Sequence, residues 1–217
     1  MIRLYDYELS GNCYKLRLLM HILDVPYERV PVDFYPGREH RSAAFLRINP
    51  LGQLPVLEDG DLRLRDAQAI LIYLAARYDP SGRWYPRDPA AMGTIGMWLA
   101  FADAITASAS AARLHDTLFY DADVEKCRAA AHALFRVLDE HLWFAGQEGQ
   151  RWIATRGDPS IADIACFPYV MLSEEGGISR EDYPALRRWT DAVKGIPGFT
   201  VMSGIFPGSP SSYSGLP

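Results

Sequence analysis

The sequence predicts an α/β domain followed by an all-helical domain. Residues 1–80 alternate strand-like and helix-like runs in the order βαβαββα, whereas residues 89–206 carry only helical periodicity. Residues 81–88 continue a Pro-Ser-Gly turn signal, and we expect them to form a linker. Residues 207–217 are rich in Pro, Gly and Ser, so we expect a flexible tail there.

The first elements follow from local patterns of apolar and polar residues. Ile2–Tyr7 alternates and indicates a strand, and Cys13–Leu23 has apolar residues at helical spacing. A second strand is expected at Tyr27–Val32 and a short helix at Arg41–Ile48. The loop between the first strand and the first helix, residues 10–12, therefore lies at a helix N-terminus.

The stretch from Asn49 to Leu74 supplies two more strands and a helix. Leu54–Leu57 is a short apolar run that contains a proline, which belongs at a strand start, edge or bulge. Asp59-Gly60 is a hairpin signal, and Leu62 and Leu64 alternate with arginines as in a half-buried strand. Asp66 can cap the helix that follows.

The second domain is predicted to consist of amphipathic helices. Met92–His115 is rich in Ala and Ser, and Asp121–Trp143 has apolar residues at core spacing. Ser160 and Asp163 form an S-x-x-D capping box at the start of a further helix, and Tyr183–Lys194 forms another. We interpret the box as structural.

Composition excludes several classes of function. The net charge is −5 and there is no basic run, so we expect no nucleic-acid partner. The N-terminus lacks an apolar leader, and Asp103 interrupts the most apolar helix, so no run approaches the roughly 20 residues of a membrane span. Three cysteines without a CxxC pair favour a reduced, cytoplasmic compartment. Five histidines without HExxH spacing predict no metal site.

Several motifs together resemble the cytosolic glutathione transferases. N-P-x-G-Q-L-P-V-L at Asn49–Leu57, followed by D-A-Q-A-I-x-x-Y-L at Asp66–Leu74, is similar to their glutathione-binding segment. The S-I-A-D box resembles the folding motif of their second domain. The resemblance covers nearly the whole chain and implies a thioredoxin-like first domain, a cis bond before Pro55 and glutathione as co-substrate. The family usually has a serine where this chain has Ala67.

The thiol-handling residue is predicted at the start of the first helix. A helix N-terminus presents unpaired N–H groups and a partial positive charge, which favour a thiolate. L-Y-D-Y-x-x-S-x-x-x-x-K-L-R resembles the bacterial serine-type transferases, which makes Ser10 the donor to sulfur unless it only caps the helix. Asn12 is a rival donor, and Cys13 is an alternative through a mixed disulfide. Tyr5 is expected in the core.

The resemblance also implies how glutathione is held. The backbone of Leu54, before Pro55, should pair with the cysteinyl unit as an added strand pairs with an edge. Asp66 should receive the γ-glutamyl ammonium, and the N–H of Ala67 its carboxylate. The remaining candidates are Gln53, His40 and Arg41 at the glycine end, and Asp103, which we expect to reach the same ammonium across a dimer unless it is an ordinary helix acid.

A small-molecule electrophile is expected between the Ser10 loop and the long helix. The candidate lining residues are Tyr7, Met97, Phe101, Ile105 and Ser108. An apolar stripe at this spacing is also typical of a core, and an alternative role for the Ala and Ser residues nearby is close packing at a homodimer interface.

The predicted function is conjugation of glutathione to a hydrophobic electrophile, as in detoxification. One alternative is an isomerase of the maleylacetoacetate type, whose Ser-Ser-Cys signature is replaced by Ser10-Gly11-Asn12. Another is a non-enzymatic protein of the same fold that binds a ligand or a partner, which the missing serine at Ala67 keeps open.

Overall fold

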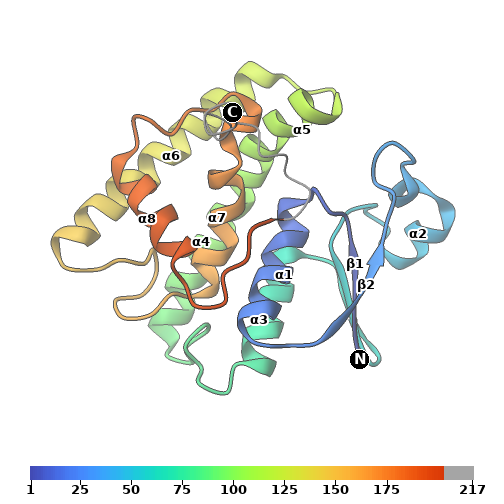
Figure 1. Cartoon of the computed structure of the whole chain (residues 1–217), viewed down its shortest axis with the longest axis horizontal. Helices are drawn as coiled ribbons and strands as arrows, with labels where there is room; N and C mark the ends of the chain where they lie inside the picture. The colour runs from blue at the N-terminus through green and yellow to red at the C-terminus, as the bar shows by residue number, and fades with distance from the viewer. Residues whose placement is uncertain (203–217) are drawn as a thin grey trace, which may run out of the picture.

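The first half of the chain forms a four-stranded sheet with three helices (Figure 1). This is a computed structural model, and it describes residues 1–202. The strands lie in the order β2-β1-β3-β4, with β1 and β2 parallel and the other neighbours antiparallel. The predicted order βαβαββα is confirmed, and the elements are β1 (Ile2–Asp6), α1 (Gly11–Ile22), β2 (Tyr27–Pro31), α2 (Ala43–Ile48), β3 (Val56–Asp59), β4 (Leu62–Leu64) and α3 (Ala67–Tyr78).

Successive residues of β1 point to opposite faces of the sheet and enter two different cores. Leu4 is fully buried with α1 and α3 in the large core that also includes the helical half. Tyr5 belongs to a small second core and packs edge-on against Phe45 of α2, with ring centroids 6.3 Å apart. Figure 1 accordingly shows α1 and α3 between the sheet and the helical half, with α2 on the far side.

From residue 89 to residue 202, where the description ends, the second half contains helices and no strand, as predicted. They are α4 (Pro89–Ile105), α5 (Ala111–Leu118), α6 (Val124–Gln147), α7 (Ile161–Met171) and α8 (Pro184–Lys194). The central helix is α7, which packs against α1, α3, α4 and α8, and its residues 161–170 are all buried. Contacts of α7 with α1 and α3 therefore join the two halves.

The capping box at the start of α7 is confirmed. Ser160 caps the helix, and Asp163 Oδ2 accepts from the backbone N–H of Ser160 at 2.9 Å. The other oxygen, Oδ1, accepts from the backbone N–H of Ile153 at 3.1 Å and from Nε1 of Trp189 at 2.9 Å. Asp163 is fully buried, so one carboxylate connects α7, α8 and the loop before α7.

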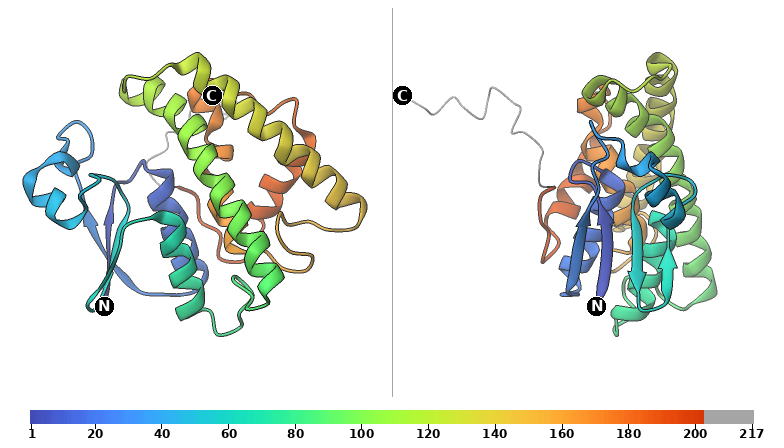
Figure 2. Two further views of the ribbon diagram at one scale, coloured as in Figure 1. Left: turned by 180° about the vertical axis from the view of Figure 1, so that it is seen from behind. Right: turned by 90° about the vertical axis from the view of Figure 1, so that its right-hand side faces the viewer.

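The long helix differs from its prediction in two ways. It extends over 89–118, and a π-helical turn at Thr106–Ser110 separates α4 from α5. By length and composition alone it is apolar enough to cross a bilayer, which corrects the expectation that no run approaches such a span. Core helices pass the same test, and this one packs against α6 and α7. Figure 2 shows it (green) running the length of the helical half beside α6.

Other differences concern boundaries. A 3-10 turn at Glu39–Arg41 precedes α2, because Ser42 caps α2 instead of lying within it. Residues 79–88 form neither helix nor strand, so the division into residues 1–80, 81–88 and 89–206 stays a proposal. The predicted tail at 207–217 lies outside the described residues.

Candidate functional site

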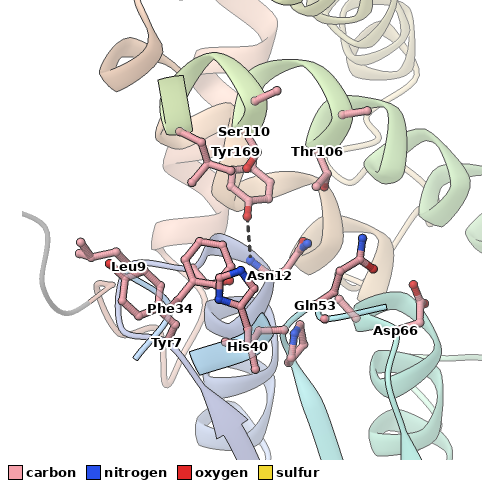
Figure 3. Close-up of a pocket in the computed structure, with 18 of the residues that line it drawn as sticks. Tyr7, Leu9, Asn12, Phe34, His40, Gln53, Asp66, Thr106, Ser110 and Tyr169 are labelled. Atoms are coloured by element: carbon pink, nitrogen blue, oxygen red, sulfur yellow. Dashed lines mark hydrogen bonds between the residues drawn. The ribbon is translucent and has the colours of Figure 1, made fainter. Parts of the chain in front are cut away.

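A cavity of about 490 Å³ opens between the two halves of the molecule (Figure 3). Its walls are the start of α1, the loops before α2 and β3, the start of α3, and the helical stretch around the π turn. The structure brings together here most of the sequence-predicted site residues: Tyr7, Ser10, Asn12, His40, Arg41, Gln53, Leu54, Pro55, Asp66, Ala67 and Asp103. Within residues 1–202, no group of three or more potential metal ligands is found.

The N-terminus of α1 faces the cavity. Ser10 is the N-cap, and its Oγ accepts from the backbone N–H of Cys13 at 3.2 Å, so its own proton stays available for a ligand. The backbone N–H of Asn12 donates to Oη of Tyr169 at 3.2 Å. The side-chain Oδ1 of Asn12 is buried and has no hydrogen-bond partner within the described chain. The hydroxyls of Ser10 and Tyr169 thus both lie at the positive end of α1.

The thiol of Cys13 does not share this position. The side chain is fully buried and does not line the cavity. Burial, and to a smaller extent the nearby carboxylate of Asp6, raise the pKa of the Cys13 thiol to about 12. The thiol is therefore neutral and inaccessible, and Cys13 behaves as a small core residue.

The loop before β3 is held in place by a buried asparagine. Asn49 donates from Nδ2 to the carbonyl of Gln53 at 2.8 Å and accepts from the N–H of Leu51 at 3.1 Å. Gly52 has a φ of +59°, and a Cβ there would lie 2.9 Å from the carbonyl oxygen of His40. The Leu54–Pro55 bond is cis. Neither the N–H nor the C=O of Leu54 has a hydrogen-bond partner among residues 1–202.

Two carboxylates enter the cavity where α3 begins. Asp66 caps α3 by accepting from the N–H of Ala69 at 2.8 Å, as predicted. Asp103 comes from α4 of the same chain and accepts a hydrogen bond from Gln68. Burial and then the nearby Asp66 raise the pKa of Asp103, against the opposing charge of Lys15. The pair therefore forms an anionic corner suited to a cation.

Aromatic rings form the opposite end of the cavity. His40 is only 2 % exposed and stacks on Phe34, with centroids 4.0 Å apart. Phe34 also stacks on Tyr120, at 5.7 Å, and lies 5.3 Å from the tilted ring of Tyr7. Burial, and then the charges of Arg41 and Arg38, lower the pKa of His40, whose Nδ1 has no partner in the described structure. Figure 3 shows Tyr7, Phe34 and His40 gathered on this side.

Of the residues predicted to line the electrophile site, Tyr7 does line the cavity. The predicted apolar stripe of the long helix does not. Met97 is 58 % exposed, and Phe101 packs edge-on against Trp98. Ile105 is buried, as is Ser108, whose hydroxyl donates to the carbonyl of Ala104 at 2.8 Å. The cavity instead meets a stripe of small and polar residues: Asp103, Thr106, Ala107, Ser110 and Ala111.

The sequence reasoning missed several lining residues: Phe34, Gln68, Thr106, Ser110, Arg113, Tyr120 and Tyr169. Arg113 is 5 % exposed, donates to the carbonyl of Leu9 at 2.8 Å and pairs with Glu175 at 2.5 Å. One signal was present for Tyr169, because it places a phenol in the otherwise apolar run Ile164–Met171. The others carry no local signal.

The sheet topology and its flanking helices define a thioredoxin-like first half, and the helical second half completes the fold of the cytosolic glutathione transferases. The family model "Glutathione S-transferase, N-terminal domain" matches residues 4–82. Glutathione S-transferase GstB of Escherichia coli K12 is 30% identical over 205 residues, which cover 87% of this chain and 91% of that protein. The chain belongs to the glutathione S-transferase family.

Two further comparisons agree. Glutathione S-transferase verG of Clonostachys rogersoniana is 27% identical over 198 residues, covering 86% of this chain and 80% of that one. The crystal structure of a possible glutathione S-transferase from Rhodopseudomonas palustris superposes with a TM-score of 0.83 at 29% identity. It covers 94% of this chain and 99% of that chain.

Proposed function

We propose that this protein binds glutathione in the cavity, stabilises its thiolate at the start of α1 and directs the sulfur at a hydrophobic electrophile. The observation that carries the proposal is that one cavity joins hydroxyls at a helix N-terminus, an unpaired backbone edge at Leu54, and the anionic corner of Asp66 and Asp103. These are complementary to a thiolate, a peptide backbone and an ammonium, the three functional parts of glutathione.

The binding mode follows from that complementarity. The N–H and C=O of Leu54 pair with the cysteinyl unit as with an added strand. Asp66 and Asp103 receive the γ-glutamyl ammonium, and the N–H of Ala67 at the start of α3 receives the γ-glutamyl carboxylate. The glycine carboxylate lies toward Gln53, with His40 and Arg41 on the same side of the cavity.

Ser10 is the proposed donor to sulfur, which makes this a serine-type member. Its hydroxyl accepts from Cys13 N–H, so its proton can be donated to the ligand. A hydrogen bond to a charged group contributes about 1.5–3 kcal/mol, which lowers a thiol pKa by roughly one to two units. Asn12, whose side chain also lines the cavity, is the second candidate for this role.

The electrophile is proposed to lie against the aromatic end of the cavity. Tyr7, Phe34 and Tyr120 present a mostly apolar wall across from the anionic corner. The thiolate sulfur forms a bond to the electrophilic carbon, and the electron pair displaced leaves with the leaving group or moves into a conjugated acceptor. The thiol proton has already passed to solvent. Positioning and charge stabilisation supply the rate.

Gly11 disfavours the isomerase alternative. A Cβ at this position would lie 2.6 Å from Cε1 of Tyr169, so the second serine of the Ser-Ser-Cys signature does not fit without moving that ring. The measurement of bound thiolate described next distinguishes an enzyme from a non-enzymatic binding protein. We also propose a homodimer, as is common in this family. We propose a cytoplasmic location because the three cysteines are free thiols.

Ultraviolet absorbance of the bound thiolate against pH tests the function. The wild-type complex should show a depressed thiol pKa, and Ser10→Ala should restore it by about one unit or more, while Ser81→Ala in the linker leaves it unchanged. If glutathione bound to Ser10→Ala keeps the wild-type thiol pKa, Asn12 becomes the proposed donor to sulfur. If the protein is saturated with glutathione but shows no thiolate absorbance, the transferase hypothesis is refuted and the binding-protein hypothesis is favoured.

A further inference from the structure

Tyr169 brings a phenol from the helical half to the sulfur-binding end of the cavity. The residue lies on α7 and is 5 % exposed, yet it lines the cavity with Ser10 and Asn12. Figure 3 shows its hydroxyl directed at the backbone nitrogen of Asn12, at the start of α1. The roles proposed above make no use of this hydroxyl.

The phenol oxygen accepts a hydrogen bond at the start of α1. Its oxygen accepts from the N–H of Asn12 at 3.2 Å. A hydrogen bond between the phenol and the side chain of Ser110 lowers the pKa of Tyr169. Within residues 1–202, no hydrogen bond donated by this hydroxyl is found. Because the oxygen accepts from Asn12, its O–H can donate to a ligand in the cavity that it lines.

The phenol is a donor over the whole physiological pH range. Burial is the largest influence and raises the pKa of Tyr169, more than the hydrogen bond from Ser110 and the charge of Arg113 lower it. Since the ordinary value is about 10, the hydroxyl is protonated at neutral pH. It therefore presents a hydrogen atom, not a charge, to an incoming anion.

The ring is held in place from two sides. A Cβ on Gly11 would lie 2.6 and 2.7 Å from its Cε1 and Cζ atoms, so only glycine allows the ring this close to the helix start. On α1, the fully buried Lys15 places its ammonium 5.5 Å from the ring centroid. A phenol fixed in this way needs little reorganisation to bind a ligand.

We propose that Oη of Tyr169 donates a second hydrogen bond to the glutathione sulfur, beside the bond from Ser10. The proposal rests on the proposed function and deepens it, because a residue of the helical half then takes part in activating the thiol. No bond in the protein forms or breaks. The thiol proton leaves to solvent, and the phenol keeps its own proton throughout.

The test is Tyr169→Phe, which keeps the ring and removes only the hydroxyl. The pKa of bound glutathione should rise by about one unit, with roughly tenfold slower conjugation at neutral pH that recovers at alkaline pH. Tyr14→Phe is the matched control, because Tyr14 is a buried tyrosine of α1 whose hydroxyl donates to the carbonyl of Thr200, outside the cavity. It should leave the thiol pKa unchanged.

Two further measurements separate a bond to sulfur from a structural role. S-methylglutathione has no thiol to ionise, so its affinity should be the same in wild type and Tyr169→Phe. Replacing Tyr169 by a ring-fluorinated tyrosine, whose hydroxyl is a stronger donor, should lower the bound thiol pKa. This second replacement keeps the test valid if Tyr169→Phe folds poorly.

The outcomes distinguish this inference from the function on which it rests. An unchanged thiol pKa in Tyr169→Phe overturns the inference alone, provided that wild type shows a depressed value that Ser10→Ala restores. Equal losses of affinity for glutathione and S-methylglutathione also overturn it, since they show that Tyr169 only shapes the helix start. A wild-type complex without thiolate overturns both.

Discussion

Removing the carboxylate of Asp163 should destabilise the protein by several kcal/mol, although the residue lies outside the cavity. Asp163→Ala deletes an acceptor that is fully buried and serves three N–H groups, those of Ser160, Ile153 and the Trp189 indole. A buried donor left without a partner costs about 1–3 kcal/mol. Three such donors, partly rescued by entering water, predict a loss of about 3–5 kcal/mol.

The size of this loss can be checked against a graded series. Ser160→Ala removes the cap hydroxyl but keeps the carboxylate and should cost about 1 kcal/mol. Asp191→Ala removes an exposed acid that, among residues 1–202, pairs only with Lys194, so about 0.5 kcal/mol or less is expected. Urea unfolding followed by tryptophan fluorescence and by circular dichroism measures all three. If Asp163→Ala falls within the range of Asp191→Ala, the argument from orphaned donors is refuted.

Three predictions concern ligand binding and pH. Asp66→Ala should weaken glutathione binding more than tenfold in calorimetry, with exposed Asp61→Ala as control; unaltered affinity would reverse the assigned orientation of the tripeptide. Ala67→Ser should tighten binding about fivefold, because a hydroxyl at the start of α3 adds one hydrogen bond of about 1 kcal/mol; no gain would show that the γ-glutamyl carboxylate lies elsewhere. His40 has a lowered folded pKa, so the unfolded chain takes up a proton first as pH falls below about 6.5, and stability is lost from there downward. His40→Gln should flatten that loss in urea midpoints and His21→Gln should not; an equal pH slope in wild type and His40→Gln would contradict it.

The sequence predicts the fold well because its signals are local. The order βαβαββα follows from short alternating runs and turn residues, and the caps at Asp66 and Ser160 follow from residue type and spacing. The boundaries shift where a stronger cap lies nearby, as when Ser42 caps α2. The π turn at Thr106–Ser110 carries no such signal, since its Ala and Ser residues suit an α-helix equally well.

The cavity is harder to predict than the fold because its two halves meet through tertiary packing. Periodicity identifies the stripe of Met97, Phe101 and Ile105 as apolar but does not say which face of α4 meets the first half. The face that does so carries Asp103 and Ser110, which a search for apolar lining passes over. Tyr169 is distant in sequence from Asn12, its partner, and no motif connects them.

The loop that presents Ser10 is held by charges from both halves of the molecule. Arg17 of α1 donates to the carbonyl of Glu8 at 2.9 Å, and Arg113 of α5 donates to the carbonyl of Leu9 at 2.8 Å. Both guanidiniums are also paired with carboxylates, Arg17 with Asp6 and Arg113 with Glu175. Each guanidinium therefore ties the loop both to a carbonyl and to a carboxylate, so the loop is fixed from both sides. The first half can therefore supply the donor, but the position of that donor depends on a helix from the second half, which is why both halves are needed for the site.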